Sequence, residues 1–163
     1  MVTLRRSAEA GHRRKFLAII DATPECDRAV YYAARRAEHT HGGLVLLFVI
    51  QPAQFQSWLG VENIMRAEAM DSAEETLAKF VARVREIASV EPELAIREGV
   101  PAEEIQKLIN DDPDIAILVL ATGTGTEGPG PLVSLIAKAN SAFPIPVTIV
   151  PGSLSDEDIA AVS

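Results

Sequence analysis

Short apolar runs alternate with longer segments of helical periodicity along this chain. Five runs have the pattern of strands, and they cover residues 15–20, 44–50, 93–98, 115–121 and 147–150. Most of them are apolar at successive positions, which is typical of parallel strands covered on both faces by helices. The segments between them carry apolar residues three and four positions apart, as helices with one buried face do.

Four helices are expected between the strands, at about residues 24–41, 61–89, 103–110 and 132–142. The resulting order β-α-β-α-β-α-β-α-β places a helical crossover between each pair of successive strands. Because such crossovers are right-handed, few arrangements remain, and a doubly wound parallel sheet is the economical one. The pattern therefore predicts an α/β fold with a five-stranded parallel sheet and helices on both faces.

The chain length of 163 residues fits a single domain. Residues 1–13 are expected to be a flexible arm, residues 14–151 the folded domain, and residues 152–163 a flexible acidic tail. The loop at residues 52–60 contains the single tryptophan, Trp58. An exposed tryptophan there would suggest a partner surface, whereas a buried one would belong to the core.

The composition narrows the classes of partner. Lysine and arginine number 15 against 23 acidic residues, which gives a net charge of −8. Such a surface repels phosphate backbones, so no nucleic-acid partner is expected. The longest apolar run is too short to span a membrane, and no secretory signal is recognisable. A single cysteine, Cys26, cannot form an internal disulfide, which suits a reducing compartment, and a cytoplasmic location is expected.

The most informative stretch is the glycine-rich loop after the strand at 115–121. It contains Gly123, Gly125, Gly128 and Gly130, and Ser134 follows it. In an open α/β sheet this position borders the ligand crevice, and the helix that begins there offers unpaired N–H groups to an anion. The spacing G-x-G-x-x-G also occurs, but no acidic residue follows at the distance that a dinucleotide ribose requires.

A second interpretation of the loop stays open. Glycine is also abundant in surface loops that bind nothing. Glu127 would repel a phosphate, and Pro129 and Pro131 remove two N–H donors. The residues alone therefore leave an anion site and a plain surface loop as alternatives.

No catalytic constellation is apparent. His39 and His41 lie at a helix end without further metal ligands nearby in sequence. Cys26 lies between Glu25 and Asp27, which oppose a thiolate, so a structural role is favoured. No nucleophile has a recognisable base beside it. Any turnover is expected to be limited to slow hydrolysis of a bound nucleotide.

From about Arg14 to Pro151 the chain resembles the universal stress protein family. The matching segments are FLAIID at 16–21, LLFV at 46–49, REGVPAEEI at 97–105, DIAILVL at 114–120 and FPIPVTIV at 143–150. The resemblance implies the strand order 3-2-1-4-5 of the adenine nucleotide α-hydrolase-like fold. It also implies a homodimer formed through the edge strand Val147–Val150.

The resemblance further implies a site for an adenine nucleotide, ATP or AMP, with Mg²⁺ as a companion of the nucleotide. Family members that bind ATP use an aspartate after the first strand, a valine near the end of the second, and the motif G-x-x-G-x9-G-[ST]. Asp21 and Val49 match the first two positions, and Gly125 and Gly128 match the first half of the motif.

The second half of the motif departs from the family. It falls on Val133 and Ser134, so valine replaces the expected glycine. We expect the Val133 side chain to obstruct a triphosphate. The cofactor-binding residues predicted from the sequence are Asp21, Val49, Gly123, Gly125, Gly128, Gly130 and Ser134. The alternative is a dimerisation or protein-interaction module of the same family, which binds an unknown protein partner and no nucleotide.

Overall fold

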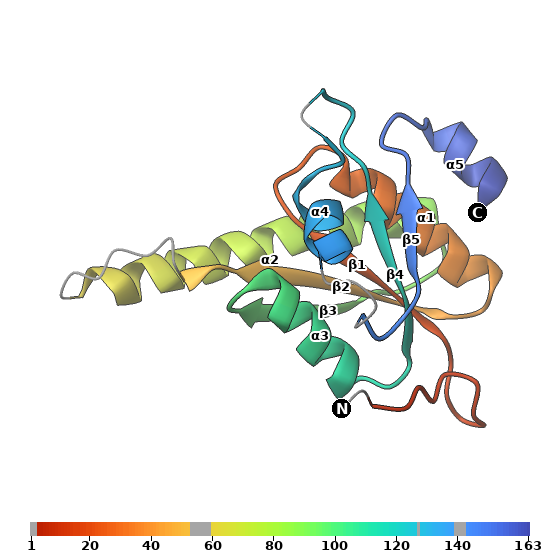
Figure 1. Ribbon diagram of the computed structural model, residues 1–163, viewed down its shortest axis with the longest axis horizontal. Helices are drawn as coiled ribbons and strands as arrows, with labels where there is room; N and C mark the ends of the chain where they lie inside the picture. Colours follow the sequence, from red (N-terminus) through yellow and green to blue (C-terminus); the bar gives the residue numbers. More distant parts are fainter. Residues whose placement is uncertain (1–2, 53–59, 127, 139–142) are drawn as a thin grey trace.

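The computed structural model describes residues 3–52, 60–126, 128–138 and 143–163. Across these residues the chain forms five strands and five helices (Figure 1). In chain order they are β1 Lys15–Ile20, α1 Cys26–His39, β2 Gly43–Ile50, α2 Val61–Ile87, β3 Glu93–Glu98, α3 Pro101–Asp111, β4 Ile115–Ala121, α4 Pro131–Lys138, β5 Val147–Val150 and α5 Asp156–Val162.

The five strands form one parallel sheet in the order β3-β2-β1-β4-β5. This confirms the predicted fold class and strand order. The chain moves outward from β1 in one direction through β2 and β3, and then returns to the other side of β1 with β4. The order of the sheet therefore reverses between β1 and β4, where open α/β sheets bind ligands at the carboxyl ends of their strands.

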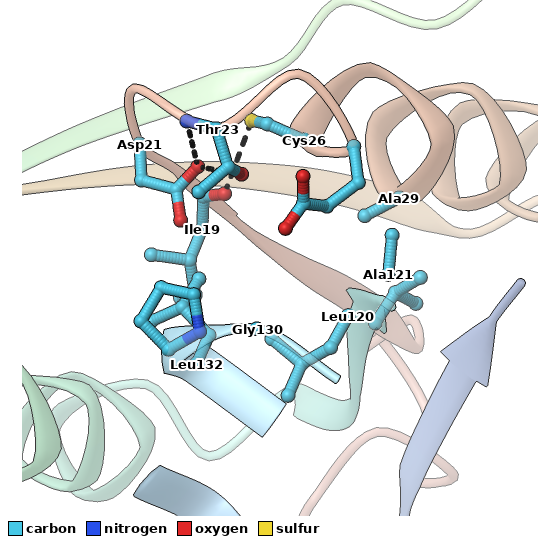
Figure 2. A pocket seen from close by; sticks show the side chains of 12 residues that line it. Ile19, Asp21, Thr23, Cys26, Ala29, Leu120, Ala121, Gly130 and Leu132 are labelled. Atoms are coloured by element: carbon cyan, nitrogen blue, oxygen red, sulfur yellow. Dashed lines mark hydrogen bonds between the residues drawn. The ribbon is translucent and has the colours of Figure 1, made fainter. Parts of the chain in front are cut away.

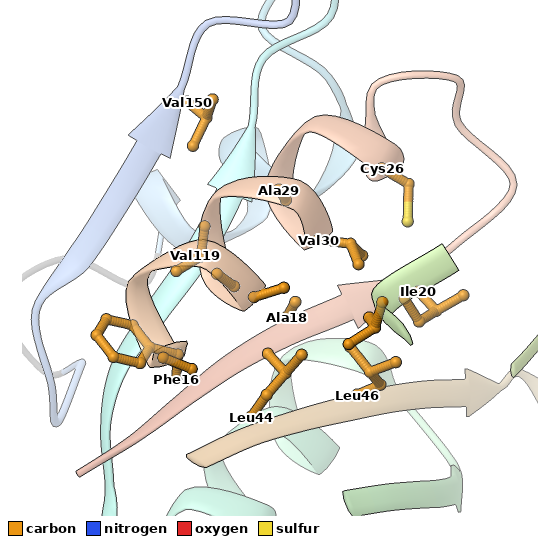
Figure 3. Packing of buried hydrophobic residues seen from close by; sticks show 14 of the residues in the cluster. Phe16, Ala18, Ile20, Cys26, Ala29, Val30, Leu44, Leu46, Val119 and Val150 are labelled. Carbon is orange, nitrogen blue, oxygen red and sulfur yellow. The ribbon is translucent and has the colours of Figure 1, made fainter. Parts of the chain in front are cut away.

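Strand β1 contributes to two apolar layers on opposite faces of the sheet. Phe16, Ala18 and Ile20 pack with α1, α2 and α5 on one face (Figure 3). Leu17 and Ile19 pack with α3 and α4 on the other. Successive side chains of a strand point to opposite faces, so an unbroken apolar run is what a strand between two helical layers requires.

The C-terminal segment differs from the flexible tail expected from the sequence. Residues 156–162 form α5, and Ser155 caps its start in a reciprocal pair with Asp158. The side chain of Ile159 is 0% exposed and belongs to the apolar layer beneath α1. One anchoring residue in a short acidic segment produces no apolar periodicity, which is why the helix was not predicted.

An ion-pair network holds α5 against its neighbours. The guanidinium groups of Arg28 and Arg83 both contact the carboxylates of Asp27 in α1 and Asp156 in α5. Burial alone would raise the pKa of Asp27, but hydrogen bonds and charges from Arg83 and Arg28 lower it overall. The network therefore adds stability above the ordinary carboxyl pKa and loses it as the pH falls below that value.

The N-terminal arm also makes specific contacts where flexibility was expected. The Arg5 guanidinium donates to the carbonyl oxygens of Ile109 at 2.6 Å and of Asp112 and Ile115 at 3.1 Å each. The last carbonyls of a helix lack partners within the helix, and a basic side chain can satisfy them. Arg5 does so at the end of α3.

Some expectations fall on residues outside the described ranges. The loop around Trp58 is among them, and so is the expected continuation of α4 to residue 142, since α4 is described to Lys138. Within the described residues, no helix is both long and apolar enough to cross a membrane.

We expect Ile159→Ala to lower the free energy of unfolding by about 2–4 kcal/mol, because it leaves a cavity beneath α1. The matched control is Val162→Ala in the same helix, where the side chain is 65% exposed; its effect should stay within about 0.5 kcal/mol. Urea unfolding followed by circular dichroism measures both. Equal effects of the two substitutions would mean that α5 does not dock.

Candidate functional site

The chain turns sharply between β1 and α1, and Asp21 stabilises that turn. Its Oδ1 atom accepts a hydrogen bond from the backbone N–H of Thr23 at 3.0 Å and another from the Thr23 hydroxyl. Side chains of aspartate commonly stabilise turns by this bond to the backbone two residues on. Within the described residues, Oδ2 of Asp21 has no such partner and remains available as an acceptor.

A mostly apolar cavity of about 410 Å³ opens beside this turn. Asp21 and Val49 line it together with the starts of α3 and α4. Its walls are formed by Ile19, Ile20, Asp21, Ala22, Thr23, Val49, Gln51, Pro101, Pro131, Leu132 and Leu135. The volume lies within the range of pockets that bind small molecules and cofactors.

A second cavity of about 470 Å³ adjoins the first and is lined by the glycine-rich loop. The two cavities share Thr23 and Pro131. The lining of the second comprises Thr23, Pro24, Glu25, Gly123, Thr124, Gly125, Gly128, Gly130, Pro131 and Ser134. All seven residues predicted from the sequence therefore line these two adjoining cavities, which together are called the cleft. Asp21 and Val49 lie in its apolar part, and the glycines and Ser134 lie in its glycine-rich part. Figure 2 shows a smaller pocket that shares lining residues with both cavities, with Asp21 and Thr23 across from Gly130 and Leu132.

Few backbone donors of the loop face a ligand. The N–H of Gly123 donates to the carbonyl of Pro129 at 2.9 Å, so it is already used. The N–H of Ser134 donates to the carbonyl of Gly130 in the first turn of α4. Pro131 has no N–H, which leaves Leu132 and Val133 as the residues of this turn whose N–H groups have no partner among the described residues. Glu127 lies outside those residues.

Val133 does not obstruct the cleft, contrary to the expectation from the sequence. Its side chain is 9% exposed and packs into the apolar layer between the sheet and α3. It lines neither part of the cleft. The helical period explains the difference, because Val133 and Ile136 share the sheet-facing side of α4, whereas Pro131, Ser134 and Leu135 face the cleft.

Glu25 is a residue of the cleft that the sequence analysis missed. Its Oε1 atom would lie 3.0 Å from a Cβ atom at Gly130 and 3.4 Å from one at Gly123. From the sequence, Glu25 counted only as an acidic residue at a helix start. Glu25 faces the glycine-rich loop because of the fold: the turn after β1 and the loop after β4 lie on opposite sides of the crevice. The described residues that line the two parts of the cleft include no lysine or arginine.

Cys26 lies behind the cleft and plays a structural part. Its Sγ donates to the carbonyl oxygen of Ile19 at 3.4 Å, and burial raises the pKa of the thiol to about 12. The thiol therefore stays protonated at neutral pH and is a poor nucleophile. The described residues contain no group of three or more histidine, cysteine or acidic side chains that could hold a metal ion.

Comparison with protein families gives a match over residues 12–151 to the universal stress protein family. The chain belongs to this family. Comparison with curated protein sequences gives no significant match.

Solved structures with the same fold come from several members of the family. UspA from Lactobacillus plantarum has a TM-score of 0.70 at 17% identity, over 84% of this chain and 97% of that one. A protein from Archaeoglobus fulgidus in complex with dAMP has a TM-score of 0.59 at 18% identity, over 84% and 97%. A protein from Arabidopsis thaliana with AMP bound has a TM-score of 0.59 at 20% identity, over 88% and 94%.

We expect Cys26 of this universal stress protein to resist thiol reagents in the native state. Below the ordinary thiol pKa of 9.0, the folded and unfolded states both keep the proton; between 9.0 and about 12 only the folded state does, so stability is lost as the pH rises through that window. Labelling with a chromogenic disulfide at about pH 8 should be slow for the native protein and complete in about 6 M guanidinium chloride. Rapid labelling of the native protein would contradict this burial.

Proposed function

We propose that this universal stress protein binds an adenine nucleotide in the cleft between the carboxyl ends of β1 and β4. The observation that carries the proposal is that two differently lined cavities adjoin at Thr23 and Pro131. One is apolar with a single carboxylate, and the other is lined by glycines and hydroxyl groups. A nucleotide has the same division between an apolar ring and a polar phosphate.

The apolar part suits adenosine. Val49, Leu132 and Leu135 offer aliphatic surfaces against which a flat purine can pack. Oδ2 of Asp21 can accept a hydrogen bond from a ribose hydroxyl or from the exocyclic amine of adenine. Pockets of this kind usually combine apolar walls with a few polar groups that fix the orientation of the ligand.

The glycine-rich part suits the first phosphate. The Ser134 hydroxyl lines it beside the start of α4, where the positive end of the helix dipole favours an anion. Solved members of the family support an adenine ligand, since complexes with AMP, dAMP and cAMP are known among them. Where the nucleotide carries Mg²⁺, phosphate oxygens would supply most of its ligands.

We further propose that two copies pair through the free edge of β5. The N–H of Leu118 donates to Pro146 and that of Thr122 to Val150, so alternate residues of β5 face β4. The backbone groups of Val147 and Ile149 therefore point to the open edge. The Ile149 side chain is 48% exposed. An apolar, unpaired edge favours pairing with a second strand.

The nucleotide proposal predicts stabilisation by adenine ligands. At a ligand concentration of 100 Kd, the free energy of unfolding should rise by about 2.7 kcal/mol. Thermal unfolding and isothermal titration with adenosine, AMP and cAMP measure this, with GMP as the base-specificity control. Absence of both heat and thermal shift with every adenine ligand at millimolar concentration would leave the protein-interaction module as the function.

Asp21→Asn tests the assignment of the adenosine part. Asparagine keeps an oxygen for the Thr23 turn but replaces the second acceptor by a donor, so the Kd for adenosine should rise about tenfold. Glu86→Gln is the control, because Glu86 lies exposed in the last turn of α2, which leads to the amino end of β3 and away from the cleft. Equal affinities of the two variants would exclude Asp21 from the site.

The dimer proposal predicts that Ile149→Lys lowers the molar mass measured by sedimentation from that of a dimer to that of a monomer. Two lysines brought together across a paired edge repel each other. Ile149→Val keeps the apolar edge and should remain dimeric. A dimer that survives the lysine, or a monomeric wild type, would refute this interface.

A further inference from the structure

The carboxylate of Glu25 lies where the glycine-rich loop would otherwise receive phosphate. Gly130 has φ +103°, and a Cβ atom there would lie 3.0 Å from Oε1 of Glu25, closer than nine in ten real Cβ contacts. Glycine at 130 thus makes room for this carboxylate as well as for the backbone turn. A Cβ atom at Gly123 would lie 3.4 Å from the same oxygen.

The backbone on both sides of Glu25 is anchored. Glu25 is the N-cap residue of α1, but its carboxylate caps no backbone N–H. Its carbonyl accepts the N–H of Arg28 at 2.9 Å, and the next residue, Cys26, is buried against β1. With the chain fixed on both sides, the Glu25 side chain extends into the glycine-rich part of the cleft, whose lining includes it.

Among the described residues, no positive side chain lines the cleft to offset this charge. Two carboxylates, Asp21 and Glu25, line its two parts, and neither lining contains lysine or arginine. The nearest guanidinium that shares a cavity with Glu25 is that of Arg28, which already contacts Asp27, Asp156 and the carbonyl of Leu154. Pro129 and Pro131 remove two further N–H donors from the loop.

A polyphosphate would therefore meet a negative charge and few donors. Each added phosphate increases the charge that must be placed beside Glu25, and repulsion between like charges is strong where water is partly excluded. Adenosine avoids that repulsion because it occupies only the apolar part. AMP brings a single phosphate to the Ser134 end of the loop.

We propose that Glu25 is a specificity residue that makes this cleft select adenosine and its monophosphate over ADP and ATP. The inference rests on the proposed binding of an adenine ligand. It states that the site discriminates among adenine ligands by their number of phosphates. The recognition chemistry is a purine nucleoside with at most one phosphate. Glu25 acts by direct repulsion of the second and third phosphates.

Isothermal titration of the full chain tests this with adenosine, AMP, ADP and ATP, in EDTA and at constant ionic strength. For the wild type, the Kd should rise from AMP through ADP to ATP, by about tenfold overall, which corresponds to about 1.4 kcal/mol. Glu25→Gln should lower the Kd for ATP by about tenfold and change that for adenosine less than twofold. Glu86→Gln makes the same change in net charge away from the cleft and should leave the series unaltered.

Three results would overturn the role of Glu25. The first is equal affinity of the wild type for AMP and ATP. The second is an equal effect of Glu25→Gln on the affinities for adenosine and ATP. The third is an increase in ATP affinity on addition of Mg²⁺ that depends on Glu25. In the third case Mg²⁺ would tighten ATP for the wild type but not for Glu25→Gln, and Glu25 would be a metal ligand. Glu25→Ala also removes the charge and should also bind ATP more tightly than the wild type. Thermal unfolding of both variants checks that their altered ATP affinity does not come from a folding defect.

The same titrations distinguish this inference from the proposed function. If adenosine binds and the phosphate dependence is absent, the role of Glu25 fails while the adenine site stands. If neither adenosine nor any nucleotide binds the wild type or Glu25→Gln, the adenine site fails and takes the inference with it.

Discussion

The burial of β1 on both faces is the constraint on which the rest of this structure depends. Its unbroken apolar sequence requires a helical layer on each side and a strand along each edge. With β2 on one edge and β4 on the other, the chain must reverse its direction of travel across the sheet. The cleft follows from that reversal, because no crossover covers the carboxyl ends of β1 and β4 where the two halves meet.

The C-terminal segment contacts the start of the glycine-rich loop and fixes its position. The N–H of Gly152 donates to Oγ1 of Thr122 at 3.2 Å, and a Cβ atom at Gly152 would lie 2.0 Å from the carbonyl oxygen of Thr122. The chain therefore passes from β5 to α5 in close contact with the first residue after β4. The docking of Ile159 and the ion pairs of Asp156 fix that passage from the far side. The contact of Gly152 with Thr122 and the docking of α5 therefore both fix the base of the glycine-rich loop.

Elements with a repeated apolar pattern could be predicted from the sequence, whereas segments held in place by individual residues could not. Strand and helix order could be derived because each buried face repeats an apolar residue at a fixed interval, and the strand order followed from the resemblance to the family. Ile159 is an apolar anchor of helix α5, and one guanidinium that satisfies three carbonyls is an anchor of the N-terminal arm. A single residue has no period. Its partner lies about a hundred positions away for Arg5, and nothing local identifies it.

Some features of the candidate site could be predicted from the sequence, and others could not. The seven predicted residues came together because they occupy strand ends, a loop and the first turn of α4, whose places the topology fixes. The role expected of Val133 was wrong because motif alignment records which residue stands at a position and not which way its side chain points. On an eight-residue helix with one face against the sheet, a valine that replaces glycine can be absorbed by the core. Glu25 lies about a hundred residues before the loop that it faces, outside any motif. A substitution within the motif thus leaves the cleft open, whereas an acidic residue outside it changes the charge that a ligand meets.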